Sequence, residues 1–282
     1  MNLPRTSNAR LRASVVVPAF NERELIEDVL DRLDRYMETV RQKYDCELIV
    51  VDDGSSDGTA AALESWSRAH PGRLRTLTHA RNAGLVAAIR TGCAAATGDM
   101  IVVMDADLSY SPETIGVMLD AQALHGAAMA IASPYMRGGR TGNVPFSRLA
   151  ASKLANLLLS ACVRGRVKTF TGMVRSYDAT ALRAVLAERE EGEFNSWIVA
   201  QFLARGEAFV EVPAALVWPR SRRREPSRMS WRSFLDRVKL TLVTARVLLR
   251  SIAVPSMSNR SQVGPSAHNW DLGAPVKISD NV

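Results

Sequence analysis

Short apolar runs alternate with segments of helical periodicity along the first half of the chain, and this alternation constrains the fold more than any other feature. The apolar runs lie at residues 14–17, 48–51, 74–78 and 100–104, and Pro18 is expected to end the first of them. Between the runs, apolar side chains recur every three or four residues, most clearly over residues 23–43 and 85–96. We therefore predict an α/β fold with a mostly parallel sheet that helices cover on both faces.

Composition excludes several classes of protein. The 282 residues are 47% hydrophobic, which is enough to form a sizeable core and argues against a disordered chain. The three cysteines are widely spaced, which argues against a disulfide framework or a structural zinc site. A net charge of +7 favours an anionic partner. An aromatic content of only 6% and the lack of a zinc finger argue against nucleic acid as that partner.

Membrane and export signals are missing from the sequence. No run reaches the roughly 18 to 20 apolar residues that a spanning helix needs. The first twelve residues are polar and basic, without the apolar stretch of a secretory signal. We therefore expect a cytoplasmic protein, and contact with the cytoplasmic face of a membrane stays open.

Acidic residues follow three of the predicted strands, where open α/β sheets bind their ligands. Asp52 and Asp53 follow the second run, and Asp105 and Asp107 follow the fourth. Residues two apart in extended backbone point to the same side, so Asp105 and Asp107 can converge on one Mg²⁺ or Mn²⁺ ion. The alternative for an isolated Asp-x-Asp is a solvated turn. Neither a Gly-x-Gly-x-x-Gly motif after the first strand nor a P-loop is present.

Four motifs together resemble the family 2 inverting glycosyltransferases, and within them the dolichol- or polyprenyl-phosphate mannosyltransferase group. The motifs are Val-Val-Pro-Ala-Phe-Asn-Glu at 16–22, Asp-Asp-Gly-Ser-Ser-Asp-Gly-Thr at 52–59, Arg-Asn-Ala-Gly-Leu at 81–85 and Asp-Ala-Asp-Leu-Ser at 105–109. The resemblance covers roughly residues 14–230. It implies a GT-A fold, a GDP- or UDP-linked sugar as donor, Mg²⁺ or Mn²⁺ as cofactor and polyprenyl phosphate as acceptor.

The resemblance also assigns the donor site. Two sets of residues are implied to bind the donor nucleotide: Pro18, Phe20 and Glu22 around the nucleoside, and Asp52, Asp53, Asp105 and Ala106 around the base, ribose and diphosphate. The metal ion is implied to be held by Asp105 and Asp107. Many relatives have tyrosine where this chain has Phe20, and some have a glutamine metal contact where it has Ser109.

The second half of the chain resembles the family more loosely. Arg148 and Asn156 match a segment in which an arginine faces the acceptor phosphate, and Thr171–Tyr177 matches a further loop. Thr169 replaces an acidic residue of that loop. The acceptor or phosphate site is implied to comprise Arg148, Arg222, Ser227 and Arg228.

Chemistry supplies the expected catalytic roles. Breaking a sugar–diphosphate bond builds negative charge on the leaving phosphate, which a divalent ion and the arginines Arg148 and Arg222 can stabilise. A lipid phosphate acceptor is already anionic, so it needs no strong general base. A hydroxyl acceptor needs one, and Asp107 is the candidate.

The sequence thus predicts a hexosyltransferase, with mannose or glucose as the sugar. Transfer to a soluble hydroxyl, or nucleotide-sugar binding without catalysis, are the alternatives. Residues 1–13 are expected to be flexible, 14–230 to form the glycosyltransferase domain and 255–282 to be a disordered tail. Residues 231–254 have the pattern of an amphipathic helix with basic side chains, suited to a membrane surface, a membrane subunit or the domain itself.

Overall fold

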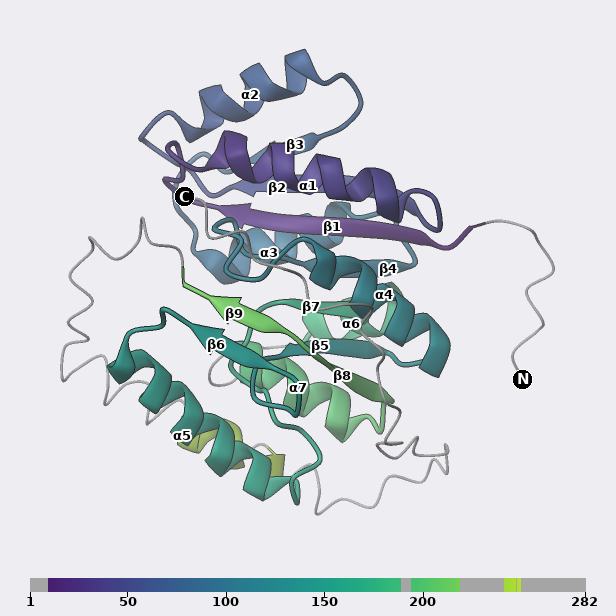
Figure 1. Ribbon diagram of the computed structural model, residues 1–282, viewed down its shortest axis with the longest axis vertical. Coiled ribbons are helices and arrows are strands. Elements are labelled where there is room, and N and C mark those ends of the chain that lie inside the picture. Colours follow the sequence, from purple (N-terminus) through teal and green to yellow (C-terminus); the bar gives the residue numbers. More distant parts are fainter. Residues whose placement is uncertain (1–9, 189–193, 219–240, 247, 250–282) are drawn as a thin grey trace.

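A seven-stranded sheet forms the centre of the molecule in the part of the chain that the computed structural model describes, residues 10–188, 194–218, 241–246 and 248–249 (Figure 1). Its strand order is β3-β2-β1-β4-β7-β5-β8. The strands are β1 (Arg12–Ala19), β2 (Asp45–Asp52), β3 (Arg75–Thr78), β4 (Met100–Val103), β5 (Met129–Ser133), β7 (Arg175–Asp178) and β8 (Phe209–Pro213). Only β7 runs antiparallel to its neighbours β4 and β5. The predicted, mostly parallel sheet is therefore confirmed.

Helices cover both faces of this sheet, as the sequence predicts. On one face α1 (Ile26–Val40), α2 (Thr59–Ala69) and α4 (Glu113–His125) share a core cluster with Val15 and Val17. On the other face α3 (Leu85–Ala95), α5 (Phe146–Cys162), α6 (Ala179–Leu186) and α7 (Phe194–Ala204) share a second cluster with Val16. Adjacent residues of β1 serve opposite cores, which explains its continuous apolar run. Among the described helices, none combines the length and apolar content needed to cross a bilayer.

The first strand is longer than predicted at both ends. It begins at Arg12, which pairs with Asp45, so Arg12 and Ala13 do not belong to a flexible N-terminus. At the other end it continues through Pro18, which pairs with Val51 of β2. Proline has no backbone N–H to donate to the ladder of a neighbouring strand. It is tolerated here because pairing with β4 has already ended at Val16.

A second, two-stranded sheet lies between the main sheet and α5 in the view of Figure 1. It consists of β6 (Arg140–Gly142) and β9 (Ala215–Val217), which run parallel. A backbone hydrogen bond of 2.8 Å from Val217 to Ser109 ties β9 to the loop after β4. The small sheet thereby connects the second half of the chain to the acidic strand end.

The loops after β2 and β3 meet at Gly54. This residue has φ +70°, and a Cβ atom there would lie 2.3 Å from the carbonyl carbon of Arg81 and 2.6 Å from the nitrogen of Asn82. Two constraints therefore act at one position: a left-handed backbone, and a neighbouring backbone that cannot move aside as a side chain can. Gly72 has a similar φ of +74° but has nothing within 4 Å of the Cβ position.

Comparing alanine at these two glycines should separate strain from steric overlap. Gly72→Ala is expected to lower the free energy of unfolding by about 1 kcal/mol, the cost of a left-handed alanine. Gly54→Ala is expected to cost at least about 2 kcal/mol more, because the 81–82 backbone must shift. Urea denaturation of both variants measures the difference, and equal losses would show that the two loops are not in close contact.

Candidate active site

Three strand ends meet at one edge of the sheet, as the acidic motifs predict. The strands β2, β1 and β4 are neighbours, with Ala19 opposite Asp52 and Val16 opposite Val103. The backbone N–H of Met104 donates to the carbonyl of Val16 over 3.0 Å, which extends the contact beyond β4. The loops that begin at Phe20, Asp53 and Met104 consequently leave the sheet side by side. The topology thus brings the predicted donor-site residues together.

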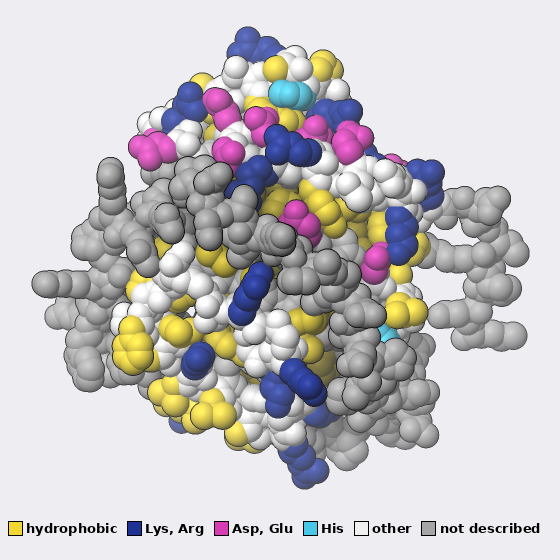
Figure 2. Space-filling model, in the orientation of Figure 1, with side chains coloured by type: hydrophobic (Ala, Val, Ile, Leu, Met, Phe, Trp, Pro, Cys, Tyr) yellow, Lys and Arg dark blue, Asp and Glu magenta, His cyan; other side chains and the backbone are white. Residues whose placement is uncertain are grey.

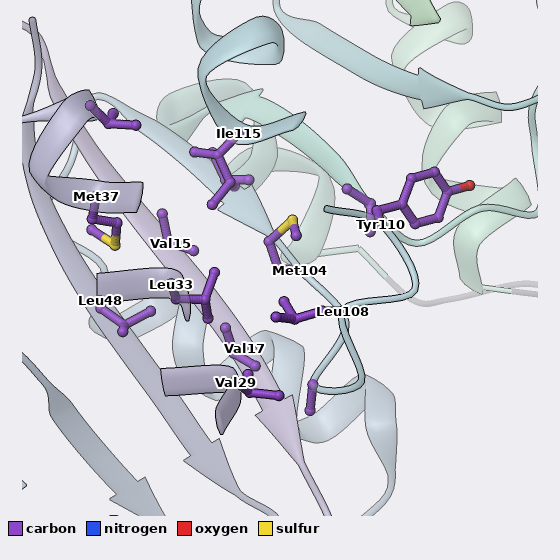
Figure 3. Packing of buried hydrophobic residues seen from close by; sticks show 14 of the residues in the cluster. Val15, Val17, Val29, Leu33, Met37, Leu48, Met104, Leu108, Tyr110 and Ile115 are labelled. Atoms are coloured by element: carbon purple, nitrogen blue, oxygen red, sulfur yellow. The ribbon is translucent and has the colours of Figure 1, made fainter. Parts of the chain in front are cut away.

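The loop after β4 alternates between buried apolar side chains and carboxylates. Met104, Ala106, Leu108 and Tyr110 are all at most 7% exposed. In Figure 3 Met104 and Leu108 lie among Val17, Val29 and Ile115 of the core. The intervening Asp105 and Asp107 are half-buried. Four anchors in the core thereby hold the two carboxylates at the surface of the strand end, as expected from their spacing.

Ser109 connects the two carboxylates, a role that the sequence did not indicate. Its hydroxyl donates to Asp105 Oδ2 over 2.8 Å, and its backbone N–H donates to Asp107 Oδ1 over 2.9 Å. The turn between them is tight: Leu108 has φ +47°, which is rare for a residue with a side chain. Strained backbone of this kind persists where the surrounding packing enforces it, and it is frequent at active sites.

The donor set fits a hard divalent cation. Asp105 and Asp107 offer carboxylate oxygens, the ligands that Mg²⁺ and Mn²⁺ prefer. Within the described ranges, His, Cys, Asp and Glu form no group of three that could hold a metal. The protein therefore supplies at most these two side chains from its described part, and substrate phosphates and water must complete the coordination. This is the usual arrangement for Mg²⁺ with a phosphorylated substrate.

Hydrogen bonds lock the loop after β1 to the loop after β2. The N–H of Asn21 donates to Ser55 Oγ, and Asn21 Oδ1 accepts from the N–H of Ser56. The N–H of Glu22 donates to Thr59 Oγ1 over 2.9 Å. Asn21 has φ +54°, a conformation that asparagine tolerates better than most residues. The ring of Phe20 remains 43% exposed beside this junction.

The loop after β2 contains Asp57, which accepts hydrogen bonds from the N–H and hydroxyl of Thr59 and from the N–H of Arg23. Asp57 therefore holds the start of α2, although the N-cap position itself is Gly58. These contacts fix the relative position of the two loops, so that Phe20 and Glu22 are held beside the end of β2.

Asp52 and Asp53 have different environments, although both are buried. Asp53 accepts the backbone N–H groups of Ala83 and Gly84, at 2.9 and 2.7 Å, so its carboxylate holds the start of α3. Asp52 Oδ1 accepts the N–H of Ser55, whereas its Oδ2 has no partner in the described structure. Of these two residues, Asp52 alone keeps a buried acceptor oxygen without a partner in the described part of the chain. The predicted contact of Asp53 with the nucleotide stays a prediction, and the structure shows this carboxylate bound to the chain itself.

His79 is a further member of this site that the sequence did not single out. Its Nδ1 lies 2.7 Å from Asp53 Oδ1, and its Nε2 lies 2.9 Å from Thr91 Oγ1 on α3. Burial alone raises the pKa of Asp53, but the hydrogen bonds from Ala83, His79 and Gly84 outweigh it, and the net pKa is lowered. The carboxylate therefore stays charged and keeps the 79–84 loop in place.

Arg148 is linked to the acidic loop indirectly, through the small sheet. Its guanidinium stacks on the ring of Trp218, 4.9 Å from the centroid, and its Nε is buried without a partner in the described part of the chain. Trp218 follows Val217, whose N–H donates to the carbonyl of Ser109. Trp218 was not predicted from the sequence. A chain of contacts therefore leads from Arg148 to Trp218, from the adjacent Val217 to Ser109, and from Ser109 to Asp105 and Asp107.

The loop 168–173 is held by polar side chains. Asn156 of α5 accepts the N–H groups of Phe170 and Thr171 and donates to Thr171 Oγ1 over 2.8 Å. Glu211 of β8 accepts the N–H groups of Lys168 and Thr169. Burial raises the pKa of Glu211, and these hydrogen bonds reduce that shift without cancelling it. The acceptor-side segments named by the sequence thus form one packed unit.

Three predicted acceptor residues, Arg222, Ser227 and Arg228, lie outside the described residues, as do most of the predicted amphipathic helix and all of the predicted tail. The predicted roles of these residues stay predictions. So do those of Pro18, Phe20, Glu22, Ala106 and Arg148.

Comparison with known proteins identifies the family. The model of the family described as Glycosyl transferase family 2 matches residues 14–186, more than half of the chain and nearly all of the site described above. The chain belongs to glycosyl transferase family 2. Its acidic strand end is the candidate donor site.

Curated relatives of this chain include a mannosyltransferase and a phosphomannose synthase. A dolichol-phosphate mannosyltransferase from Pyrococcus furiosus is 32% identical over 206 residues, which cover 72% of this chain and 56% of that protein. A polyprenol monophosphomannose synthase from Mycolicibacterium smegmatis is 32% identical over 216 residues, 74% of this chain and 79% of that one. The chain thus spans little more than half of the first relative.

Solved structures show the same fold at lower sequence identity. Glucosyl-3-phosphoglycerate synthase from Mycobacterium tuberculosis, in complex with Mn²⁺, UDP and phosphoglyceric acid, has a TM-score of 0.58 and 21% identity, over 88% of this chain and 80% of that one. A mannosyltransferase from Pyrobaculum calidifontis, in complex with GDP-mannose and Mn²⁺, has a TM-score of 0.54 and 20% identity, over 87% and 74%. The chain therefore has the GT-A-like fold that the sequence predicts.

Removing the Asp53 charge should lower the stability of the protein at neutral pH and make that stability less sensitive to acid. A carboxyl whose pKa is lowered by folding stabilises the native state above its unfolded pKa and loses that contribution as the pH falls through the folded value. Asp53→Asn should lower the free energy of unfolding by about 2 kcal/mol at pH 7. The gap from wild type should narrow below about pH 4.

Urea denaturation between neutral and acid pH measures this gap. Asp45→Asn is the control, because Asp45 is an exposed carboxylate at the opposite end of β2. It should stay within about 0.5 kcal/mol of wild type at neutral pH. A gap for Asp53→Asn that is constant across the pH range would rule out the charge as the stabilising feature.

Proposed function

We propose that this enzyme transfers a hexose, mannose or glucose, from a GDP- or UDP-linked sugar to a polyprenyl phosphate at the cytoplasmic face of a membrane. The observation that carries the proposal is the pair of half-buried carboxylates, Asp105 and Asp107, held together by Ser109 at the end of the central strand β4. The named activities of the two mannosyl-transferring relatives support the acceptor class.

The donor nucleoside is proposed to bind beside Phe20. Its exposed ring offers an apolar face for a base, next to Pro18 and the locked Asn21–Glu22 turn. A buried acceptor without a partner is costly, and a base N–H or ribose hydroxyl would satisfy Asp52 Oδ2. This buried carboxylate oxygen thus suits a nucleoside donor.

The diphosphate is proposed to lie at Asp105 and Asp107. A divalent ion held by these two carboxylates would neutralise the charge that develops on the leaving diphosphate. The Mn²⁺ complexes of two structural neighbours support a divalent cofactor, and Mg²⁺ and Mn²⁺ are both compatible with the oxygen ligands here. Ser109 orients both carboxylates, and the buried Ala106 between them keeps the backbone close to the core.

The acceptor phosphate is proposed to meet Arg148, together with Arg222, Ser227 and Arg228 outside the described residues. The aromatic stack on Trp218 fixes the plane of the Arg148 guanidinium, which limits the entropy lost on gripping a phosphate. A prenyl phosphate oxygen is already anionic at neutral pH, so it can attack the anomeric carbon without losing a proton. Asp107 would be required as a base only for a hydroxyl acceptor.

A donor and acceptor panel tests the reaction class. The enzyme with Mn²⁺ should transfer sugar from a GDP- or UDP-hexose to a short prenyl phosphate in detergent, and product formation can be followed by mass spectrometry. A prenyl alcohol of the same length is the matched control, and it should give no product. Transfer to hydroxyl acceptors but never to the phosphate would contradict the proposed acceptor. Nucleotide binding without any turnover would contradict the proposed catalysis and indicate a nucleotide-sugar-binding protein.

Carboxylate variants test the metal pair. Asp105→Asn or Asp107→Asn should lower turnover about a thousandfold or more, because the donor diphosphate loses its charge stabilisation. The thermal unfolding temperature should change little, because both side chains are only half-buried. Asp45→Asn, at the other end of the sheet, should keep wild-type turnover. Near-normal turnover by Asp105→Asn and Asp107→Asn would contradict the proposal that these carboxylates bind the donor diphosphate through a metal ion.

A further inference from the structure

Helix α5 presents a more apolar side to solvent than to the protein. Leu154, Leu157 and Leu158 follow one another at helical spacing and are 49%, 67% and 48% exposed. Phe146, at the start of the helix, is 85% exposed. The buried side instead includes the polar Asn156 and Ser160 beside Leu159, which is 0% exposed. A surface helix of a globular protein normally has the opposite arrangement.

Charge on and beside this helix has one sign. Residues 146–168 carry five basic side chains and no acidic one: Arg148, Lys153, Arg164, Arg166 and Lys168. Of these, only Arg148 is drawn inward, onto Trp218, whereas the other four are exposed. In Figure 2 yellow and dark blue side chains gather at the lower left, where Figure 1 places α5, and no magenta lies among them.

A short stretch near the C-terminus has the same character. Residues 241–246 and 248–249 are helical, and Leu248 is buried in the cluster that also contains Leu159 of α5. Leu242, Val243 and Leu249 are exposed, and the described side chains of the stretch include the basic Arg246 and no acid. Seven of the eleven large apolar side chains exposed in the described structure thus belong to these two segments.

We infer that the outer side of α5, defined by Phe146, Leu154, Leu157 and Leu158 and called here the α5 face, docks onto an anionic lipid bilayer. Exposed apolar patches rimmed by polar groups mark interaction surfaces. Apolar side chains enter the acyl boundary while basic side chains meet lipid phosphates, which is how interfacial amphipathic helices bind membranes. The lack of any acid on residues 146–168 complements a negative surface and would not be needed for a neutral apolar partner.

The docked orientation also explains the polar inner side of α5. Asn156 and Ser152 bind the 170–171 loop, and Arg148 lies one to two turns before them on the same helix. A bilayer against the α5 face would therefore bring lipid phosphate to within one helix diameter of these groups. This inference deepens the proposed function, since it rests on a prenyl phosphate acceptor that must be reached at a membrane surface.

Vesicle binding tests the α5 face. The full chain is mixed with vesicles of phosphatidylcholine alone or with equal parts of phosphatidylglycerol, and the bound fraction is measured by sedimentation. Wild type should bind the anionic vesicles in preference to the neutral ones. The double variant Leu157→Asp/Leu158→Asp should bind them about tenfold more weakly or worse, because two apolar anchors are lost and negative charge is added.

The matched control is Leu124→Asp, which changes a leucine of α4 that is 72% exposed on the other side of the main sheet. It should bind like wild type. A charge pair, Lys153→Glu/Arg164→Glu, should reduce binding to the anionic vesicles with little effect on the neutral ones. Equal binding by all variants would overturn the inference, as would a dimer in sedimentation that the leucine variant abolishes without any binding of vesicles by wild type.

Transfer to a short prenyl phosphate in detergent separates this inference from the proposed function. If the α5 face is the docking surface, the leucine variant keeps that transfer and loses only vesicle binding and turnover on acceptor embedded in vesicles. Vesicle binding by wild type without any prenyl phosphate transfer would instead contradict the proposed function and leave the docking surface standing.

Discussion

The alternation of buried and acidic side chains between Met104 and Tyr110 is the constraint on which the site depends. The core buries four side chains of this loop: Met104, Ala106, Leu108 and Tyr110. Their burial fixes the position of the two carboxylates between them at the strand end. This arrangement strains the backbone at Leu108, which has a left-handed conformation, and the burial of the four apolar side chains must offset that strain. Because β4 lies at the middle of the sheet, this arrangement places a pair of negative charges where loops from both halves of the chain can reach them.

Carboxylates at this edge divide into two groups according to the groups that they contact. Asp53 and Asp57 accept backbone N–H groups and fix the loops that begin α3 and α2. Asp52 retains an oxygen without a partner in the described structure, and Asp105 and Asp107 converge on Ser109. Burying several negative charges together is tolerable only when donors neutralise some of them. Backbone N–H donors do this for Asp53 and Asp57, and the proposed cation and nucleotide would do it for Asp52, Asp105 and Asp107.

The same division holds on the acceptor side, where α5 separates two environments. Its inner side uses hydrogen bonds from Asn156 to hold the 170–171 loop, and its outer side carries exposed leucines. A helix of this kind gains little from burying its leucines in its own domain, so their exposure must be offset elsewhere. In the proposed docking, a lipid surface would supply that gain and would bring a membrane-bound phosphate to Arg148 at the start of the helix.

Sequence alone determined the α/β architecture, the acidic strand ends and the family, because strand and helix periodicities and the four motifs are local patterns. It misjudged both ends of β1, because tolerance of Pro18 depends on where β4 stops pairing. It also missed His79 and Trp218, and gave Asp53 a ligand role without showing its bonds to the 79–84 loop. Tertiary structure decided these points, since each is a contact between residues far apart in the chain, as between Val217 and Ser109. Such contacts arise from packing, and no local pattern encodes them.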